Sequence, residues 1–189
     1  MHRNLPTYLS GDPEGVLEFD VPTFLREAGL PPLPRTVAEY LPVIDYTRVG
    51  VLACSKLLVD LQRNNKIVLL CNGPCTSGQA ANFDLAAVLD HLPERDDVIY
   101  LLTQPGHGQN REDVFDTDEL TGRQGCQSDL NAISYLSRFC SLIVGRCSGP
   151  HVAAQVMENW MDSTKTLVGF THHRNGACFV LNPDALGLR

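Results

Sequence analysis

Residues that suit the binding of an anion are concentrated in two short polar turns. The first turn, residues 72–79 (NGPCTSGQ), follows an apolar run and contains Asn72, Gly73, Ser77, Gly78 and Gln79. Glycine lets the backbone approach a ligand closely, and unpaired N–H groups at the start of a helix attract negative charge. The turn has neither the lysine of a P-loop nor the GxGxxG spacing of dinucleotide-binding proteins, and its composition also suits an ordinary strand-to-helix turn.

The second turn, residues 145–151 (GRCSGPH), has the same setting, because an apolar run leads into it and Pro150 suits the first turn of a helix. The guanidinium of Arg146 matches the geometry of a phosphate. Ser148 and Gly149 would line the turn with Pro150, and His151 could bond a ligand oxygen. The alternative is that Arg146 pairs with an acidic residue and His151 lies on the surface. We favour a binding role, because two such turns follow strands of one predicted sheet.

Other groups indicate chemistry less directly. Cys75 and Cys147 lie in these turns, and Cys147 follows Arg146 near a helix start, which favours the thiolate. A cysteine nucleophile is therefore an alternative, although no order of cysteine, histidine and aspartate stands out. The acidic residues within 113–119 and the run 172–174 (HHR) are typical of solvated loops, and no two pairs of cysteines have the spacing of a zinc site. We predict no metal and no cofactor.

Composition excludes several classes of partner. The chain has 189 residues, of which 43% are hydrophobic and 20% charged, and its formal net charge is −7. An acidic chain without a basic cluster repels a phosphate backbone, so we predict no binding to nucleic acid. No apolar stretch approaches the ~20 residues needed to span a bilayer, and the N-terminus lacks the apolar run of a signal peptide. An odd number of cysteines, seven, indicates free thiols in a reducing compartment, and we predict a cytoplasmic protein.

Apolar runs and helical spacing predict the elements that position the two turns. Strands are expected at residues 67–71, 98–103, 141–145, 166–170 and 178–181, helices at 49–64, 80–92, 129–139 and 150–160, and a polar loop from 104 to about 116. This alternation predicts an α/β fold, a Rossmann-like and mainly parallel sheet with helices on both faces. Ligands of such sheets bind at the carboxyl ends of strands, near a switch in strand order. Both turns follow buried strands, so we expect them to form one site.

The first 48 residues are expected to form an extended arm. Seven of the twelve prolines lie among the first 45 residues, and proline restricts φ and removes a backbone donor. Residues 49–189 are expected to form a single Rossmann-like domain.

Two segments together resemble the C-terminal, donor-binding domain of GT-B glycosyltransferases, heptosyltransferase-like members in particular. They are residues 67–92 (IVLLCNGPCTSGQAANFDLAAVLDHL) and residues 129–160 (DLNAISYLSRFCSLIVGRCSGPHVAAQVMENW). In both, a buried strand, a small turn and a helix follow one another as in that family. The likeness extends over roughly residues 66–181, and the order of elements carries it more than any diagnostic residue does.

The resemblance implies a domain that binds the diphosphate of a nucleotide sugar. The residues implied in binding are Gly73, Ser77, Gly78 and Gln79 of the first turn and Arg146, Ser148, Gly149 and Pro150 of the second. Arg146 and the helix N-termini would neutralise the diphosphate leaving group, and no general base is assigned. GT-B enzymes react in a cleft between two such domains, so a second domain or chain would have to complete the cleft. The alternative is a nucleotide-binding or interaction module without catalysis.

Overall fold

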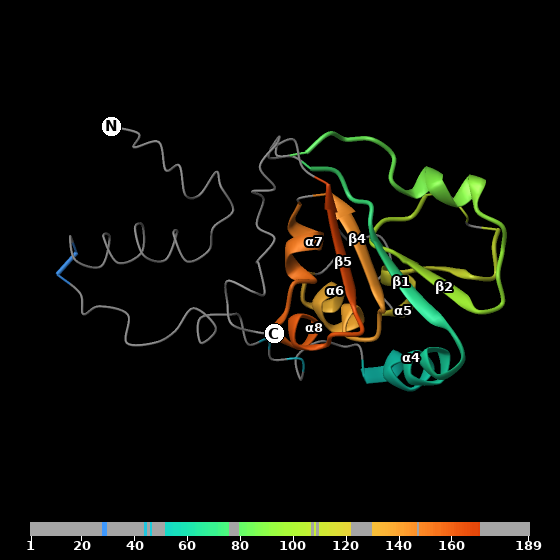
Figure 1. Cartoon of the computed structure of the whole chain (residues 1–189), viewed down its shortest axis with the longest axis horizontal. Coiled ribbons are helices and arrows are strands. Elements are labelled where there is room, and N and C mark those ends of the chain that lie inside the picture. Colours follow the sequence, from blue (N-terminus) through green and yellow to red (C-terminus); the bar gives the residue numbers. More distant parts are fainter. Residues whose placement is uncertain are drawn as a thin grey trace.

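The computed structural model describes residues 28–29, 44, 46, 52–75, 80–106, 108, 110–121, 130–146 and 148–170, which contain one five-stranded sheet with helices packed on it (Figure 1). The strands are β1 (Lys66–Cys71), β2 (Val98–Leu102), β3 (Val114–Asp116), β4 (Leu142–Arg146) and β5 (Thr166–Phe170). The helices are α4 (Leu52–Asn64), the 3-10 helix η3 (Ala86–His91), α5 (Thr117–Leu120), α6 (Leu130–Ser137), α7 (Gly149–Ala153) and α8 (Met157–Met161).

All neighbouring strands are parallel, and their order is β3-β2-β1-β4-β5. The central strand is β1, and its Leu70 lies opposite Leu102 of β2 on one side and Val144 of β4 on the other. The chain moves outward from β1 to β3 and then returns to the other side of β1 for β4. This arrangement is Rossmann-like, and the change of direction between β1 and β4 is the switch point at which such sheets bind ligands.

Alternate strand residues form an apolar layer on each face of the sheet. The first layer joins the strands to α4 and α6 through the buried residues Leu58, Ile67, Leu69, Leu101, Ile133, Leu136 and Ile143. The second layer joins them to η3 through Val68, Leu70, Ala86, Leu89, Tyr100 and Leu102. Because β1 and β2 are buried on both faces, their sequences are continuous apolar runs rather than alternating ones.

The structure confirms four of the predicted strands to within one residue, as β1, β2, β4 and β5, and the predicted helices at 49–64 and 129–139 as α4 and α6. The prediction of a polar loop from 104 to about 116 is wrong at its end, because the last three of these residues form β3. The short helix α5 follows directly. With three residues at the edge of the sheet, β3 is too short to give a periodic sequence pattern. The expected strand at 178–181 lies outside the described residues.

The predicted amphipathic helix at 80–92 is also wrong. Residues 81–84 have no regular structure, and only the six-residue η3 follows. Polar side chains hold the first half open: the Asn82 amide bonds the Cys75 backbone at both its nitrogen (2.7 Å) and its oxygen (3.1 Å). Such side-chain bonds compete with helix formation. In the tighter 3-10 turn, Ala86 and Leu89 lie one above the other and are buried, whereas Val88 is exposed.

The single helix expected at 150–160 is two helices, α7 and α8, separated by residues 154–156. Asn159 explains the interruption. Its Nδ2 donates to the Ala154 carbonyl oxygen at 2.7 Å, the acceptor that a continuing helix would use, and to Ser137 Oγ at 2.7 Å. The chain therefore turns, and Val156 is buried between the two short helices.

The predicted arm, residues 1–48, lies outside the described residues except for positions 28–29, 44 and 46. None of the helices in the described ranges combines the length and apolarity of a membrane-spanning segment.

Candidate functional site

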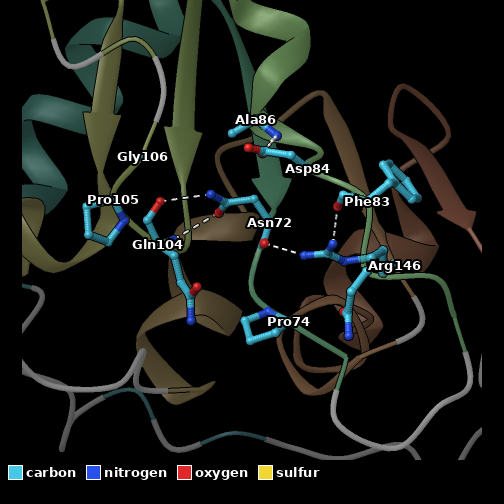
Figure 2. A pocket seen from close by; sticks show the side chains of 10 residues that line it. Asn72, Pro74, Phe83, Asp84, Ala86, Gln104, Pro105, Gly106 and Arg146 are labelled. Atoms are coloured by element: carbon cyan, nitrogen blue, oxygen red, sulfur yellow. Dashed lines mark hydrogen bonds between the residues drawn. The ribbon is translucent and has the colours of Figure 1, made fainter.

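A cavity of about 520 Å³ lies at the carboxyl edge of the sheet, beside the ends of β1, β2 and β4 (Figure 2). It is lined by Asn72, Pro74, Asn82, Phe83, Asp84, Ala86, Gln104, Pro105, Gly106 and Arg146. Because Asn72 follows β1 and Arg146 ends β4, the cavity lies across the switch point. Its size is within the range of small-molecule sites, roughly 300–1,000 Å³.

Asn72 ties the end of β1 to the loop after β2. Its Nδ2 donates to the Gln104 carbonyl oxygen at 2.9 Å, and its Oδ1 accepts from the Gln104 N–H at 2.9 Å. The Thr103 hydroxyl donates to the same Oδ1 at 3.3 Å. The amide of Asn72 thus imitates one more pair of backbone hydrogen bonds between the strands. The side chain predicted to meet a ligand holds two loops together.

Arg146 joins β4 to the loop after β1 and to the segment before η3, on the other side of the cavity. It is 3% exposed, although it lies at the end of a strand. Nη1 donates to the carbonyl oxygen of Phe83, and Nη2 donates to those of Asn72 and Gly73. Its Nε has no hydrogen-bond partner, and no acidic side chain pairs with it in the described part of the chain. The guanidinium therefore combines a clamp for the backbone with a charge that no described carboxylate neutralises.

The segment before η3 forms the wall of the cavity beyond Arg146. Asp84 Oδ1 accepts from the N–H groups of Ala86 (3.0 Å) and Ala87 (3.2 Å), and so starts η3. The ring of Phe83 lies beneath the guanidinium, whose Cζ is 5.6 Å from the ring centroid. This wall therefore places a carboxylate and an aromatic ring on the same cavity as the arginine.

Gln104 supplies an amide on the opposite side. Figure 2 shows Gln104 and Arg146 on either side of Asn72 and Pro74. A Cβ on Gly73 would lie 3.5 Å from Gln104 Cδ and Nε2 and 3.7 Å from Pro150 Cγ, so the two predicted turns and the loop after β2 meet at Gly73. The side-chain amide of Gln104 makes no hydrogen bond among the residues that the structure describes, so a ligand can reach its donors and acceptor.

The remaining predicted binding residues lie beside the cavity or outside the described ranges. Ser77, Gly78 and Gln79 belong to the latter group. Ser148 precedes α7 and is buried, and its Oγ has no hydrogen-bond partner. Gly149 is exposed and Pro150 half-buried. None of these three described residues lines the cavity, and their role in binding stays a prediction.

His151 is fully buried beneath β4, so the alternative that placed it on the surface is wrong. A Cβ on Gly145 would lie only 2.8 Å from His151 Cδ2 and 2.7 Å from Cys71 Cβ, which shows how closely the imidazole packs on the strand. Burial lowers the pKa of His151 from 6.5 to about 4, and a backbone interaction with Val168 opposes this shift as the smaller effect. The ring is therefore neutral near pH 7, and its Nε2 has no hydrogen-bond partner of ordinary geometry.

The described cysteines do not favour a thiol nucleophile. Burial raises the pKa of Cys71 well above its usual value and that of Cys140 to about 12, so both are thiols near pH 7. Cys75, one of the two candidates, is buried, and Asn82 bonds its backbone. Cys147, the other candidate, lies outside the described residues.

Sequence reasoning missed most of the cavity wall, above all Phe83, Asp84 and Gln104. Gln104 could have been found, since it is the second residue after β2 and the carboxyl ends of parallel strands share one edge. Phe83 and Asp84 were assigned to a helix, and no local pattern shows that their segment returns to the sheet edge.

Within the described ranges, no three histidine, cysteine, aspartate or glutamate side chains are grouped as a metal site requires. Comparison of the chain with models of protein families, with curated proteins and with solved structures found no match.

Proposed function

We propose that this domain binds the diphosphate of a nucleotide, and that a nucleotide sugar is its physiological ligand. The observation that carries the proposal is the guanidinium of Arg146, which is 3% exposed, lines the cavity and has no carboxylate partner among the described residues.

A buried cation is unfavourable unless other groups stabilise its charge. Three carbonyl dipoles do so in part, but Nε has no acceptor. A phosphate oxygen in the cavity would supply both the missing acceptor and the missing negative charge, in the geometry that guanidinium groups favour. Gln104, across the cavity, could donate to a second oxygen.

The position and the mixed charge of the cavity favour a ligand with sugar hydroxyls. Nucleotides bind Rossmann-like sheets at the switch point, where this cavity lies. The carboxylate of Asp84 on the same wall would repel a phosphate but can accept from hydroxyl groups. A ligand with its phosphates near Arg146 and Gln104 and its hydroxyls toward Asp84 would match the positive and the negative side of the cavity.

The finer proposal is a donor-binding domain of the GT-B glycosyltransferase kind. In that role Arg146 would stabilise the charge that develops on the departing nucleoside diphosphate. A second domain or another chain would contribute the acceptor side of the cleft. The alternative, a binding module without catalysis, would use the same ligand site and would need no second domain or chain.

The test is a thermal-shift and calorimetric screen of the full chain against UDP-, GDP- and ADP-sugars, the matching nucleoside diphosphates and pyrophosphate. We expect at least one diphosphate to bind, and Arg146→Gln to weaken its binding at least about tenfold, because a charge-assisted contact contributes roughly 1.5–3 kcal/mol. Arg63→Gln, which removes an exposed arginine of α4, is the matched control and should leave binding unchanged. Absence of binding by every diphosphate at millimolar concentration would refute the proposal.

A further inference from the structure

Two phenylalanine rings form an exposed pair at the rim of the cavity. Phe83 and Phe170 are each 41% exposed, although aromatic rings of this size are usually well buried. Their centroids are 5.3 Å apart at an interplanar angle of 88°, an edge-to-face contact. Phe83 also lines the cavity that Arg146 lines.

The position of this pair is fixed by the sheet. Phe170 is the last residue of β5 and the register partner of Arg146, so both side chains leave the same face of the sheet at its carboxyl edge. Phe83 reaches the same place from the segment before η3, where its carbonyl oxygen accepts from Arg146 and its ring lies 5.6 Å from the guanidinium. Ring and cation are therefore held as one unit, and Phe170 supports the ring from the side.

We infer that Phe83 is a stacking platform for the base of the bound nucleotide, with Phe170 setting the orientation of its ring. An exposed aromatic ring in contact with a second ring and beside a buried cation is complementary to a ligand that carries a planar ring and a phosphate. The inference rests on the proposed function for the phosphate end of the ligand. It adds that the ligand must carry a base, which distinguishes nucleotides from sugar phosphates and pyrophosphate.

The arrangement also defines a competing role. The two rings could simply shield the hydrogen bonds of Arg146 from water, in which case Phe83 would affect every anion in the cavity equally. Stacking affects only ligands that have a base, so the ratio of affinities separates the two roles.

The test measures the binding of ADP, UDP, pyrophosphate, adenosine and uridine to the full chain by calorimetry. In the wild-type chain, ADP or UDP should bind more tightly than pyrophosphate. Phe83→Leu should lower the affinity for that nucleotide by about 5- to 100-fold and change the affinity for pyrophosphate by less than about twofold. Phe83→Tyr keeps the ring and should retain the preference. Phe170→Leu should have a smaller effect of the same kind, and Phe139→Leu, two residues after α6, should have none.

A second readout is the NMR shift of the base protons, which a stacked aromatic ring moves upfield. This shift should be present with the wild-type chain and with Phe83→Tyr and absent with Phe83→Leu. The stacking role of Phe83 would be refuted if pyrophosphate and both nucleotides bound with equal affinity, or if Phe83→Leu lowered the affinity for nucleotides and pyrophosphate equally. Either result would leave the proposed anion site unaffected. Binding of nucleosides that depends on Phe83, without binding of any phosphate, would overturn the proposed function instead. If no compound binds, both are wrong.

Discussion

Among the described residues, Arg111 and Arg146 both have little exposed side-chain surface, and they are stabilised in different ways. Arg111 lies between η3 and β3 and forms a two-point ion pair with Asp113, with contacts of 2.9 Å and 2.7 Å. Its guanidinium also donates to the carbonyl oxygens of Leu89 (2.6 Å) and Leu92 (2.7 Å), which close the end of η3. The charge of Arg111 is thus neutralised by a carboxylate of the same fold.

Arg146 has the same kind of carbonyl acceptors but no carboxylate among the described residues, and it lines the cavity where Arg111 does not. The contrast separates two settings for a guanidinium of low exposure. Arg111 has a carboxylate partner within the fold, whereas Arg146 has only carbonyl acceptors among the described residues, and the proposed anion would supply the opposite charge. The four predictions below test this contrast, and the expected effects decrease from one to the next.

The largest effect is expected for Arg111→Met. Removal of the guanidinium leaves the buried carboxylate of Asp113 without its cation and takes a donor from the carbonyl oxygens at the end of η3, which should lower the free energy of unfolding by about 3 kcal/mol. Chemical denaturation measures this change. Ligand affinity should stay the same in the variant, because the cavity is not involved.

The control for this prediction is Arg95→Met. Arg95 pairs with Asp97 at 2.8 Å in the same part of the fold, but both side chains are more than half exposed. An exposed pair contributes little to stability. If the two variants unfolded alike, burial would not be the source of the stability of Arg111.

Acid titration distinguishes the two regions next. Burial holds the pKa of His151, next to the end of β4, at about 4, whereas the unfolded chain takes up this proton near 6.5. The contribution of the neutral His151 to the free energy of unfolding should therefore be fully present above pH 6.5. The free energy of unfolding should fall by about 2–3 kcal/mol as the pH decreases toward 4. The hydrogen bond from Arg111 lowers the pKa of Asp113 below 3.8, so the stability from this pair should be lost only at still lower pH.

The free energy of unfolding measured against pH tests this order. His151→Gln stays neutral and should flatten the curve between pH 6.5 and 4, whatever its effect on absolute stability. A slope that persisted in His151→Gln would assign the proton uptake to another group.

The third effect concerns Arg146→Gln, which should lower the free energy of unfolding by about 1–2 kcal/mol, less than the loss of Arg111. The carbonyl oxygens of Phe83, Asn72 and Gly73 lose their donors, but the substitution breaks no ion pair among the described residues, and it removes a buried charge. Denaturation with and without pyrophosphate gives the measurement. Pyrophosphate should stabilise the wild-type chain and not the variant.

The sequence was sufficient for four strands of the parallel sheet but not for β3, because four strands lie in apolar runs whereas β3 has only three residues. It was not sufficient for the connections. The segment around Asn82 and Asp84 has apolar residues at helical spacing, yet their side chains bond nearby backbone groups and limit the helix to η3. Helical spacing records which residues are buried, and it does not show that a short polar side chain takes the backbone hydrogen bonds first.

For the site, residue type and position identified Arg146 and Asn72 but not their partners. The carbonyl of Phe83 meets Arg146 across 63 residues of sequence, and such a pairing leaves no local pattern. His151 illustrates the same limit, since its burial depends on the close approach that Gly145 permits and on the short length of α7. These contacts follow from the packing of the sheet and cannot be derived from any single segment.

The smallest effect on stability, and the sharpest separation of stability from binding, is expected for Gln104→Ala. The backbone of Gln104 holds the Asn72 amide, and alanine keeps that backbone. Its side-chain amide makes no hydrogen bond among the described residues, so the free energy of unfolding should change by less than about 0.5 kcal/mol. Diphosphate binding should nevertheless weaken by about three- to tenfold, because one donor to the ligand is lost.

Gln62→Ala, on the exposed side of α4, is the matched control for both measurements. If Gln104→Ala bound the diphosphate as tightly as the wild-type chain while Arg146→Gln did not, the ligand would lie on the β4 side of Asn72 alone. If Gln104→Ala lost stability instead, the side-chain amide of Gln104 would help to join the ends of β1 and β2. The contrast between internal and ligand-directed polar groups would then apply to the two arginines only.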